Sequence, residues 1–273
     1  MPLSKLYVEG ALDVILMSCI VSTLPGNATV VESVGTKGSL RPRVREAREK
    51  QIEACYLRDR DFDTDPPAVV TEPTVDLRTS QGEVRGWRWC RHEIENYLLE
   101  PGVVAAATGW DQADFAAVLG RAARSLRFYT AARWAVGTAR RALPPLYELC
   151  TRPVALKNPM KVPADLSEQA SRDWAAQYVG EFRDEVTRQL ADATIAANFV
   201  TWVQQLEAAT DAHEVLLLHA GKDLLATLEP EIARKKLGNP VLFCNSIRDW
   251  ILAHPAQALA TLPEWTAFLR LLA

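Results

Sequence analysis

Three short acidic segments near the N-terminus have the residue types that bind divalent cations. The most informative is the run Asp59, Asp61 and Asp63, a D-x-D-x-D pattern that directly follows the apolar segment Ala54–Leu57. A buried strand that ends in alternating carboxylates brings several anionic oxygens to one edge of a sheet. These oxygens repel one another unless a hard divalent cation neutralises them, so the run indicates a metal site.

The other two segments place carboxylates in the same kind of position. Glu9 and Asp13 are one helical turn apart, which puts both carboxylates on one face of a helix. Glu93 and Glu95 belong to the stretch Trp89–Leu99. In all three segments the acids stand between an apolar strand and a turn or helix. Together they predict a metal-dependent phosphoryl-transfer site.

Other interpretations of the D-x-D-x-D run fit this sequence less well. In an EF-hand loop the sixth position is Gly and the twelfth is Glu, whereas Thr64 and Val70 occupy these positions here. A haloacid-dehalogenase nucleophile lies closer to the N-terminus and is followed by a Thr or Val that this run lacks. A plain solvated turn stays open as an alternative.

The composition excludes some kinds of chemistry. The chain has 273 residues, 48% of them hydrophobic, and a net charge of −3, as in many soluble globular proteins. Its five cysteines contain no C-x-x-C pair, and its four histidines show no H-x-x-x-H spacing. These patterns argue against a disulfide framework and against zinc chemistry.

The sequence predicts neither membrane insertion nor export. Its longest apolar run, Val14–Val21, is far shorter than the roughly 20 residues that cross a bilayer. The first residues lack the charged region and the cleavage site of a signal peptide. We therefore expect a cytoplasmic protein without a membrane partner.

A basic segment stands out against the acidic net charge. No acidic residue occurs between Phe115 and Tyr147, whereas six arginines do: Arg121, Arg124, Arg127, Arg133, Arg140 and Arg141. On a helix they spread over more than one face. A solvated helix and a phosphate-binding surface both stay open.

The elements that must position the acids alternate in type. Hydrophobic periodicity predicts strands and helices in the order β-α-β-α-β, at Leu3–Val8, Leu12–Ile20, Thr29–Val34, Pro42–Glu53 and Ala54–Leu57. This order implies parallel strands with crossover helices. Ligands of such sheets bind at the carboxyl ends of the strands, where Glu9 and Asp59 lie.

The next segment is a long, proline-containing excursion over Thr64–Glu83, with room for a hairpin. Next to a site, a loop of this length is often a lid or a substrate contact. A strand at Gly86–Arg91 and a helix at Glu93–Leu99, ending at Pro101, are expected to follow.

Beyond Asp111 the pattern is helical. Helices are expected at Gln112–Leu143, Asp165–Ala208, Lys222–Lys236, Pro240–Leu252 and Pro255–Ala273. We expect an α/β protein, with a catalytic domain over residues 1–110 and a largely α-helical lobe over residues 111–273.

The three acidic segments, in this order, resemble the Toprim domain. Its strands end in V-E-G and in D-x-D, and a further carboxylate follows. The motifs Y-V-E-G-x-x-D, D-R-D-F-D and H-E-I-E-N-Y-L-L resemble those of an uncharacterised Toprim-containing family (DUF4435). This family belongs to the overcoming-lysogenization-defect (OLD) nuclease branch. The later stretch His219–Leu225 resembles the G-K element of that family. The resemblance implies a Toprim-like parallel sheet flanked by helices.

The resemblance also implies roles for individual residues. Glu9 and Asp13 match the first acidic pair. Asp59 and Asp61 match the D-x-D, which Asp63 extends as a further ligand. Glu93 or Glu95 matches the later acid, and Lys222 matches the basic residue near the scissile phosphate. Glu9, Asp59, Asp61 and Lys222 would be catalytic.

The function that this resemblance implies is a nuclease that cleaves DNA or RNA with Mg²⁺ or Mn²⁺ by a two-metal mechanism, as an effector of anti-phage defence. Because the chain has no Walker motif, an ABC-type ATPase partner would be a separate subunit. Association of copies into a homo-oligomer stays open. The alternatives are an interaction subunit whose site is silent until activation, and a metal-dependent phosphatase.

Overall fold

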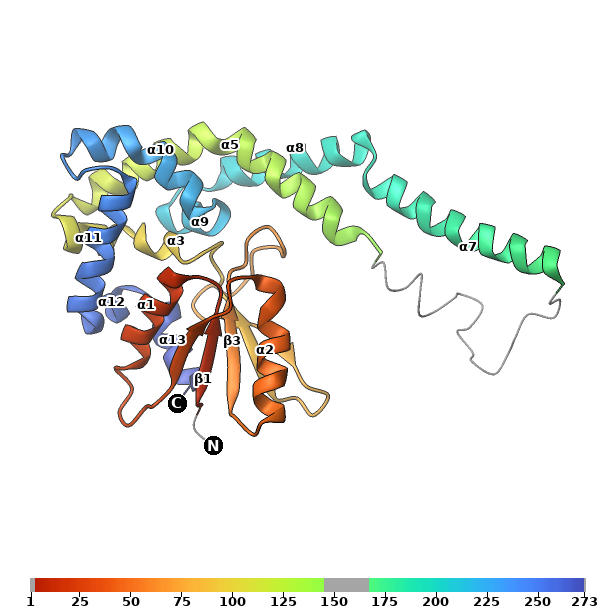
Figure 1. Ribbon diagram of the computed structural model, residues 1–273. Coiled ribbons are helices and arrows are strands. Elements are labelled where there is room, and N and C mark those ends of the chain that lie inside the picture. The colour runs from red at the N-terminus through yellow and green to blue at the C-terminus, as the bar shows by residue number, and fades with distance from the viewer. Residues whose placement is uncertain (1–2, 145–166, 273) are drawn as a thin grey trace. The chain divides into compact units, whose positions relative to one another are not determined.

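The computed structural model describes residues 3–144 and 167–272, shown as ribbons in Figure 1. Its framework is a five-stranded sheet in the order β2-β1-β3-β5-β4. The strands are β1 (Lys5–Val8), β2 (Val30–Ser33), β3 (Ala54–Arg58), β4 (Thr74–Arg78) and β5 (Val84–Arg88). β4 is antiparallel to β5, and the other neighbouring pairs are parallel. The prediction of an α/β protein with a mostly parallel sheet is confirmed.

Alternation of side chains along the strands explains why helices cover both faces of the sheet. Leu6 and Val8 of β1 are buried in a cluster with helix α1 (Ala11–Val21), whereas Tyr7 is buried with helix α2 (Lys37–Glu49). Successive residues of a strand point to opposite faces, so α1 and α2 lie on opposite sides of β1 (Figure 1). Burial on both sides is why the central strands β1 and β3 are almost continuously apolar.

Further helices belong to the same compact unit as the sheet, which comprises Met1–Thr130 and Leu206–Ala273. These helices are α3 (Glu95–Leu98), α4 (Pro101–Thr108), the first part of α5 (Gln112–Ala142), α9 (Ala212–Leu218), α10 (Gly221–Arg234), α11 (Pro240–Ala253), α12 (Pro255–Thr261) and α13 (Pro263–Leu272). Leu224, Phe243 and Trp265 join the core cluster of α1. The C-terminal helices therefore share one hydrophobic core with one face of the sheet.

The second compact unit comprises Ala131–Gln205, and its described residues are helical. It contains the end of α5, helix α7 (Glu168–Gln189) and most of helix α8 (Asp192–Ala208). Trp134 stacks on Trp202 with ring centroids 4.1 Å apart, and Trp202 Nε1 donates a hydrogen bond to Thr138 Oγ1 at 3.0 Å. The expected division into a catalytic domain over residues 1–110 and a helical lobe over residues 111–273 stays a prediction.

Prolines account for several differences between expected and observed helices. The helix expected from Pro42 begins at Lys37, and Pro42 lies inside it. Pro101, expected to follow the end of a helix, is instead the first residue of α4. Proline is tolerated at the start of a helix because its missing N–H would have no intrahelical partner. The helix expected over Pro255–Ala273 is two helices in its described part, which ends at Leu272, because Pro263 begins a new helix.

Other predicted elements differ by a few residues. The excursion Thr64–Glu83 contains β4, which pairs with β5 in an antiparallel hairpin. The strand expected at Gly86–Arg91 begins and ends earlier. The single helix expected over Asp165–Ala208 is two helices, α7 and α8, and its first two residues lie outside the described residues. In the described ranges, no helix is both long enough and apolar enough to cross a membrane.

Candidate functional site

The carboxyl ends of β1 and β3 bring two of the predicted acids together. Glu9 directly follows β1, and Asp59 directly follows β3, which pairs with β1 in parallel. Glu9 Oε1 accepts a hydrogen bond from the backbone N–H of Asp59 at 3.0 Å. The expected meeting of these acids at one edge of the sheet is therefore observed.

The start of α1 holds a third acid, Asp13, with only 7% of its surface exposed. Its Oδ2 accepts a hydrogen bond from the N–H of Gly10, the N-cap residue, at 3.2 Å. A Cβ atom at Gly10 would lie 3.1 Å from this oxygen, so glycine leaves room for the carboxylate to approach. The partial positive charge of the helix N-terminus favours an anion here.

Burial and mutual repulsion raise the pKa values of these carboxyl groups. The pKa of Asp13 is raised to about 7, by burial first and then by the charge of Glu95. The pKa of Asp59 lies well above its usual value, because of burial and then the charges of Asp13 and Glu9. Burial also raises the pKa of Glu9. We call Glu9, Asp13, Asp59 and Glu95 the inner carboxylates, since each disfavours the charge of another.

Two oxygens of the inner carboxylates are buried without a hydrogen bond. Asp59 Oδ1 and Glu95 Oε2 have no donor among the residues that the structure describes. A buried acceptor without a partner destabilises a fold by roughly 1–3 kcal/mol, and by more when it is charged. Carboxylate oxygens are also the ligands that Mg²⁺ and Mn²⁺ prefer. The two atoms therefore fit a role in metal binding.

The inner carboxylates do not form a finished coordination sphere. Within residues 3–144 and 167–272, no group of three Asp, Glu, His or Cys side chains is arranged to hold one metal ion. Unneutralised carboxylates repel one another, so a bound cation would have to draw them together from these positions.

The later aspartates of the D-x-D-x-D run bind a lysine. Lys37, at the start of α2, donates from Nζ to Asp61 Oδ2 and, at 2.8 Å, to Asp63 Oδ2. Burial opposes the charged form of Lys37, but the two aspartates outweigh it and raise its pKa. Asp61 has a left-handed backbone with φ of 49°, so the run does not continue the strand. Only Asp59 joins the inner carboxylates.

A buried arginine holds this turn in place. Arg60, between the aspartates, is fully buried. Its guanidinium donates to the carbonyls of Cys90 at 2.6 Å, Thr64 at 3.1 Å and Leu217. Burial lowers the pKa of Arg60 to about 10. The turn after β3 is therefore tied to the end of β5 and to α9.

Helix α10 brings Lys222 to the third acidic segment. The Lys222 N–H donates to Glu93 Oε1 at 2.7 Å, and Nζ donates to Glu93 Oε2 at 2.6 Å and lies 3.1 Å from Glu95 Oε1. A Cβ at Gly221 would lie 2.7 Å from the Asn96 nitrogen, so only glycine allows this approach. Asn96 Oδ1 accepts from the Gly221 N–H at 3.1 Å. Helix α10 therefore brings Lys222 to Glu93 and Glu95, and its role near the scissile phosphate stays a prediction.

The structure thus divides the seven predicted metal ligands into two groups. The inner carboxylates lie close to one another, and one of them, Glu95, also lies 3.1 Å from Lys222 Nζ. The outer carboxylates, Asp61, Asp63 and Glu93, are bound by Lys37 or Lys222. Sequence reasoning missed the contact of Lys37. The signal was its place just after β2, at the same carboxyl edge as Glu9 and Asp59.

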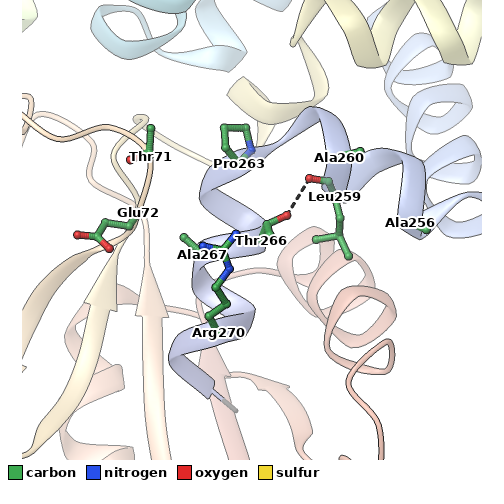
Figure 2. A pocket seen from close by; sticks show the side chains of 9 residues that line it. All are labelled: Thr71, Glu72, Ala256, Leu259, Ala260, Pro263, Thr266, Ala267 and Arg270. Atoms are coloured by element: carbon green, nitrogen blue, oxygen red, sulfur yellow. Dashed lines mark hydrogen bonds between the residues drawn. The ribbon is translucent and has the colours of Figure 1, made fainter.

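One cavity of about 590 Å³ lies apart from these residues, between the segment before β4 and helices α12 and α13 (Figure 2). Its wall consists mostly of small or apolar side chains, with Glu72 and Arg270 as the charged members. Thr266 Oγ1 donates to the Leu259 carbonyl at 2.8 Å, so this hydroxyl is used within the wall. None of the predicted site residues lines this cavity.

Comparison with known proteins adds no assignment. No protein-family model matches the chain, and a search of curated proteins finds no significant match. The motifs and the geometry of the acidic edge therefore remain as the guides to function.

Proposed function

We propose that the protein is a Mg²⁺- or Mn²⁺-dependent nuclease that hydrolyses phosphodiester bonds of DNA or RNA in the cytoplasm. The observation that carries this proposal is the pair of buried carboxylate oxygens, Asp59 Oδ1 and Glu95 Oε2, that lack a hydrogen-bond donor among the described residues. They belong to a set of mutually repelling acids at the carboxyl edge of a parallel sheet, where a cation would remove the repulsion.

The inner carboxylates would hold the metal. Glu9, Asp13, Asp59 and Glu95 supply only hard oxygen donors, which suit Mg²⁺ and Mn²⁺ better than zinc. When bound, the metal supplies Lewis-acid stabilisation of the phosphoryl oxygens and lowers the pKa of a coordinated water. Between the two candidates for the later acid, the geometry favours Glu95, because both oxygens of Glu93 are engaged by Lys222.

Two lysines would neutralise charge on the reacting phosphate. Lys37 and Lys222 are each held by two carboxylates, so their ammonium groups are positioned before substrate arrives. Positioned cations stabilise a phosphoryl-transfer transition state because its charge lies on the equatorial oxygens. Lys222 has 62% of its side chain exposed, against 25% for Lys37, and is therefore the more accessible to substrate.

The motifs support the finer assignment to the OLD-like Toprim nucleases, with an anti-phage role and an ABC-type ATPase as a separate partner. Under the alternative of an interaction subunit, the purified protein would be inactive until its partner is added. A phosphatase would use the same acids on phosphate monoesters.

Incubation of the purified chain with plasmid, single-stranded DNA and tRNA, each with Mg²⁺, Mn²⁺ or EDTA, tests the proposal. We expect metal-dependent cleavage that Glu9→Gln abolishes. Glu229→Gln, at an exposed position of α10, is the matched control and should cleave like the wild type. Wild-type cleavage by Glu9→Gln, or hydrolysis of p-nitrophenyl phosphate alone, would contradict the nuclease assignment.

A further inference from the structure

Three arginines surround one buried aspartate on the α2 side of the sheet. Asp76 of β4 has only 3% of its side chain exposed. Its Oδ1 accepts from Arg58 Nη2 at 2.8 Å and from Arg88 Nη1 at 3.0 Å. Its Oδ2 accepts from Tyr56 Oη at 2.5 Å and from Arg41 Nη2 at 3.3 Å. We call Arg41, Arg58 and Arg88 the arginine cluster.

The arginine cluster has more positive charge than its partners neutralise. Three guanidinium groups share the single charge of Asp76, and Asp63 adds only a contact of 3.4 Å to Arg58 while it also binds Lys37. Arg88 Nε is buried and has no acceptor among the described residues. Burial lowers the pKa of Arg88, and the charge of Arg58 lowers it further. A partly buried cation without its share of negative charge is costly, so the cluster favours an added anion.

The register of the sheet places this charge directly beside the inner carboxylates. Arg58 and Arg88 are opposite one another in the parallel pair of β3 and β5, where like charges destabilise. Each is the last residue of its strand, and Asp59 follows Arg58. The cluster is therefore at the carboxyl edge, one residue along the chain from the inner carboxylates.

Arg41 is the member of the arginine cluster that a ligand in solvent can reach. Its side chain is 56% exposed, whereas those of Arg58 and Arg88 are 12% and 14% exposed. Tyr56 leaves room for this arrangement by lying over Gly86, where a Cβ atom would be 2.1 Å from the ring. Guanidinium groups bind phosphate oxygens through paired N–H donors. The chemistry of the site therefore fits a phosphate group.

We propose that the arginine cluster binds a second phosphate of the substrate, a backbone phosphodiester that flanks the one cleaved at the inner carboxylates. This inference rests on the proposed nuclease function and specifies its substrate class. A substrate with phosphates at successive positions is a polynucleotide, so the site distinguishes a nuclease from a phosphatase that acts on a single phosphate.

The test measures binding without cleavage. A short fluorescent single-stranded oligonucleotide is titrated with the protein in EDTA at several salt concentrations, and inorganic phosphate is the competitor. We expect Arg41→Gln to weaken binding about tenfold. The slope of log affinity against log salt should fall by about 0.7, the value for one phosphate contact of a single strand.

Arg43→Gln is the matched control. Arg43 lies on the same helix, is 57% exposed and pairs with Glu46 rather than Asp76. It should bind like the wild type. Equal weakening by Arg41→Gln and Arg43→Gln, or no weakening by either, would overturn the inference. Arg88→Gln should also weaken binding, provided that circular dichroism shows it to be folded. If Arg88→Gln does not fold, the comparison of Arg41→Gln with Arg43→Gln alone tests the inference.

Because the assay contains no metal, its result is independent of activity. Loss of cleavage in Glu9→Gln, together with wild-type oligonucleotide binding by Arg41→Gln, would leave the nuclease function in place and remove the second phosphate site. If Arg41→Gln weakens binding but the wild-type protein never cleaves nucleic acid, the phosphate site would stand and the nuclease function would be removed.

Discussion

The inner carboxylates and the arginine cluster lie at the same edge of the sheet and have opposite imbalances of charge. Arg58 and Asp59 are consecutive residues, yet Arg58 binds Asp76, whereas Asp59 lies among acids that raise its pKa. Successive residues at a strand end point in different directions. The acidic and the basic side chains at this edge therefore form two separate groups. A metal ion would complete one group, and a phosphate would complete the other.

The difference also separates function from stability. Each inner carboxylate repels its neighbours, so removal of one relieves the folded, metal-free protein. Asp76, in contrast, is the anion that three arginines share. Its removal leaves buried positive charge without a partner. The same type of residue should therefore have opposite effects on stability in the two groups.

Asp59→Asn tests the inner group, and its effect on turnover is the largest that we expect. Cleavage should fall by about 10²- to 10³-fold or more, as when one transition-state contact is lost. The melting temperature in EDTA should stay the same or rise, because one repelling charge is gone. Cleavage assays and thermal melting give the two readouts. A large loss of melting temperature would show that Asp59 stabilises the fold, and the contrast with Asp76 would fail.

Asp76→Asn tests the other group. We expect a loss of about 3 kcal/mol in the free energy of unfolding, typical of breaking a buried ion pair. Urea denaturation measures it. Glu229→Gln, at an exposed position, is the control and should change stability little. An unchanged denaturation midpoint for Asp76→Asn would show that the arginines do not need this anion.

The pH dependence of stability should have opposite signs for the two groups in EDTA. The pKa of Asp13 is raised to about 7, so the folded state holds its proton more tightly and stability falls as pH rises from about 4 through 7. Despite burial, Arg58 and Tyr56 lower the pKa of Asp76 to about 2, so its contribution is lost only as pH falls from about 4 through 2. Over this pH range the free energy of unfolding should fall by about 4 kcal/mol, and Asp13→Asn should remove most of that fall. A slope that survives the substitution would assign it to another group.

Arg124→Glu tests whether the edge alone binds the backbone, and its effect is the smallest that we expect. Arg124 is exposed on α5, whereas Arg127 is paired with Glu207 at 2.7 Å. Oligonucleotide affinity should change by less than about threefold, since one exposed charge interacts weakly. A loss as large as that of Arg41→Gln, with a flatter salt dependence, would extend the binding surface to α5.

Much of the sheet was predictable because its cause is local. The apolar runs around Tyr7 and Tyr56 are strands because both faces are buried, and chain order then makes them parallel. The contact of Glu9 with Asp59 follows from that order. The start of α2 at Lys37 was not predicted, because glycines around it indicate a turn and only packing of the helix on the sheet overrides this preference.

The sequence by itself determined that carboxylates would collect at one edge, because strand direction and chain order decide which strand ends meet. Only the tertiary structure decided which of them keep a counterion. Lys222 is 129 positions from Glu93, and their contact depends on the close approach of α10 at Gly221. Ion pairs act over a few ångströms. The distance between two side chains that are far apart in the sequence cannot be predicted from residue type or from local pattern. The division into acids that repel one another, acids bound mainly by a lysine, and the arginine cluster is therefore a property of the fold.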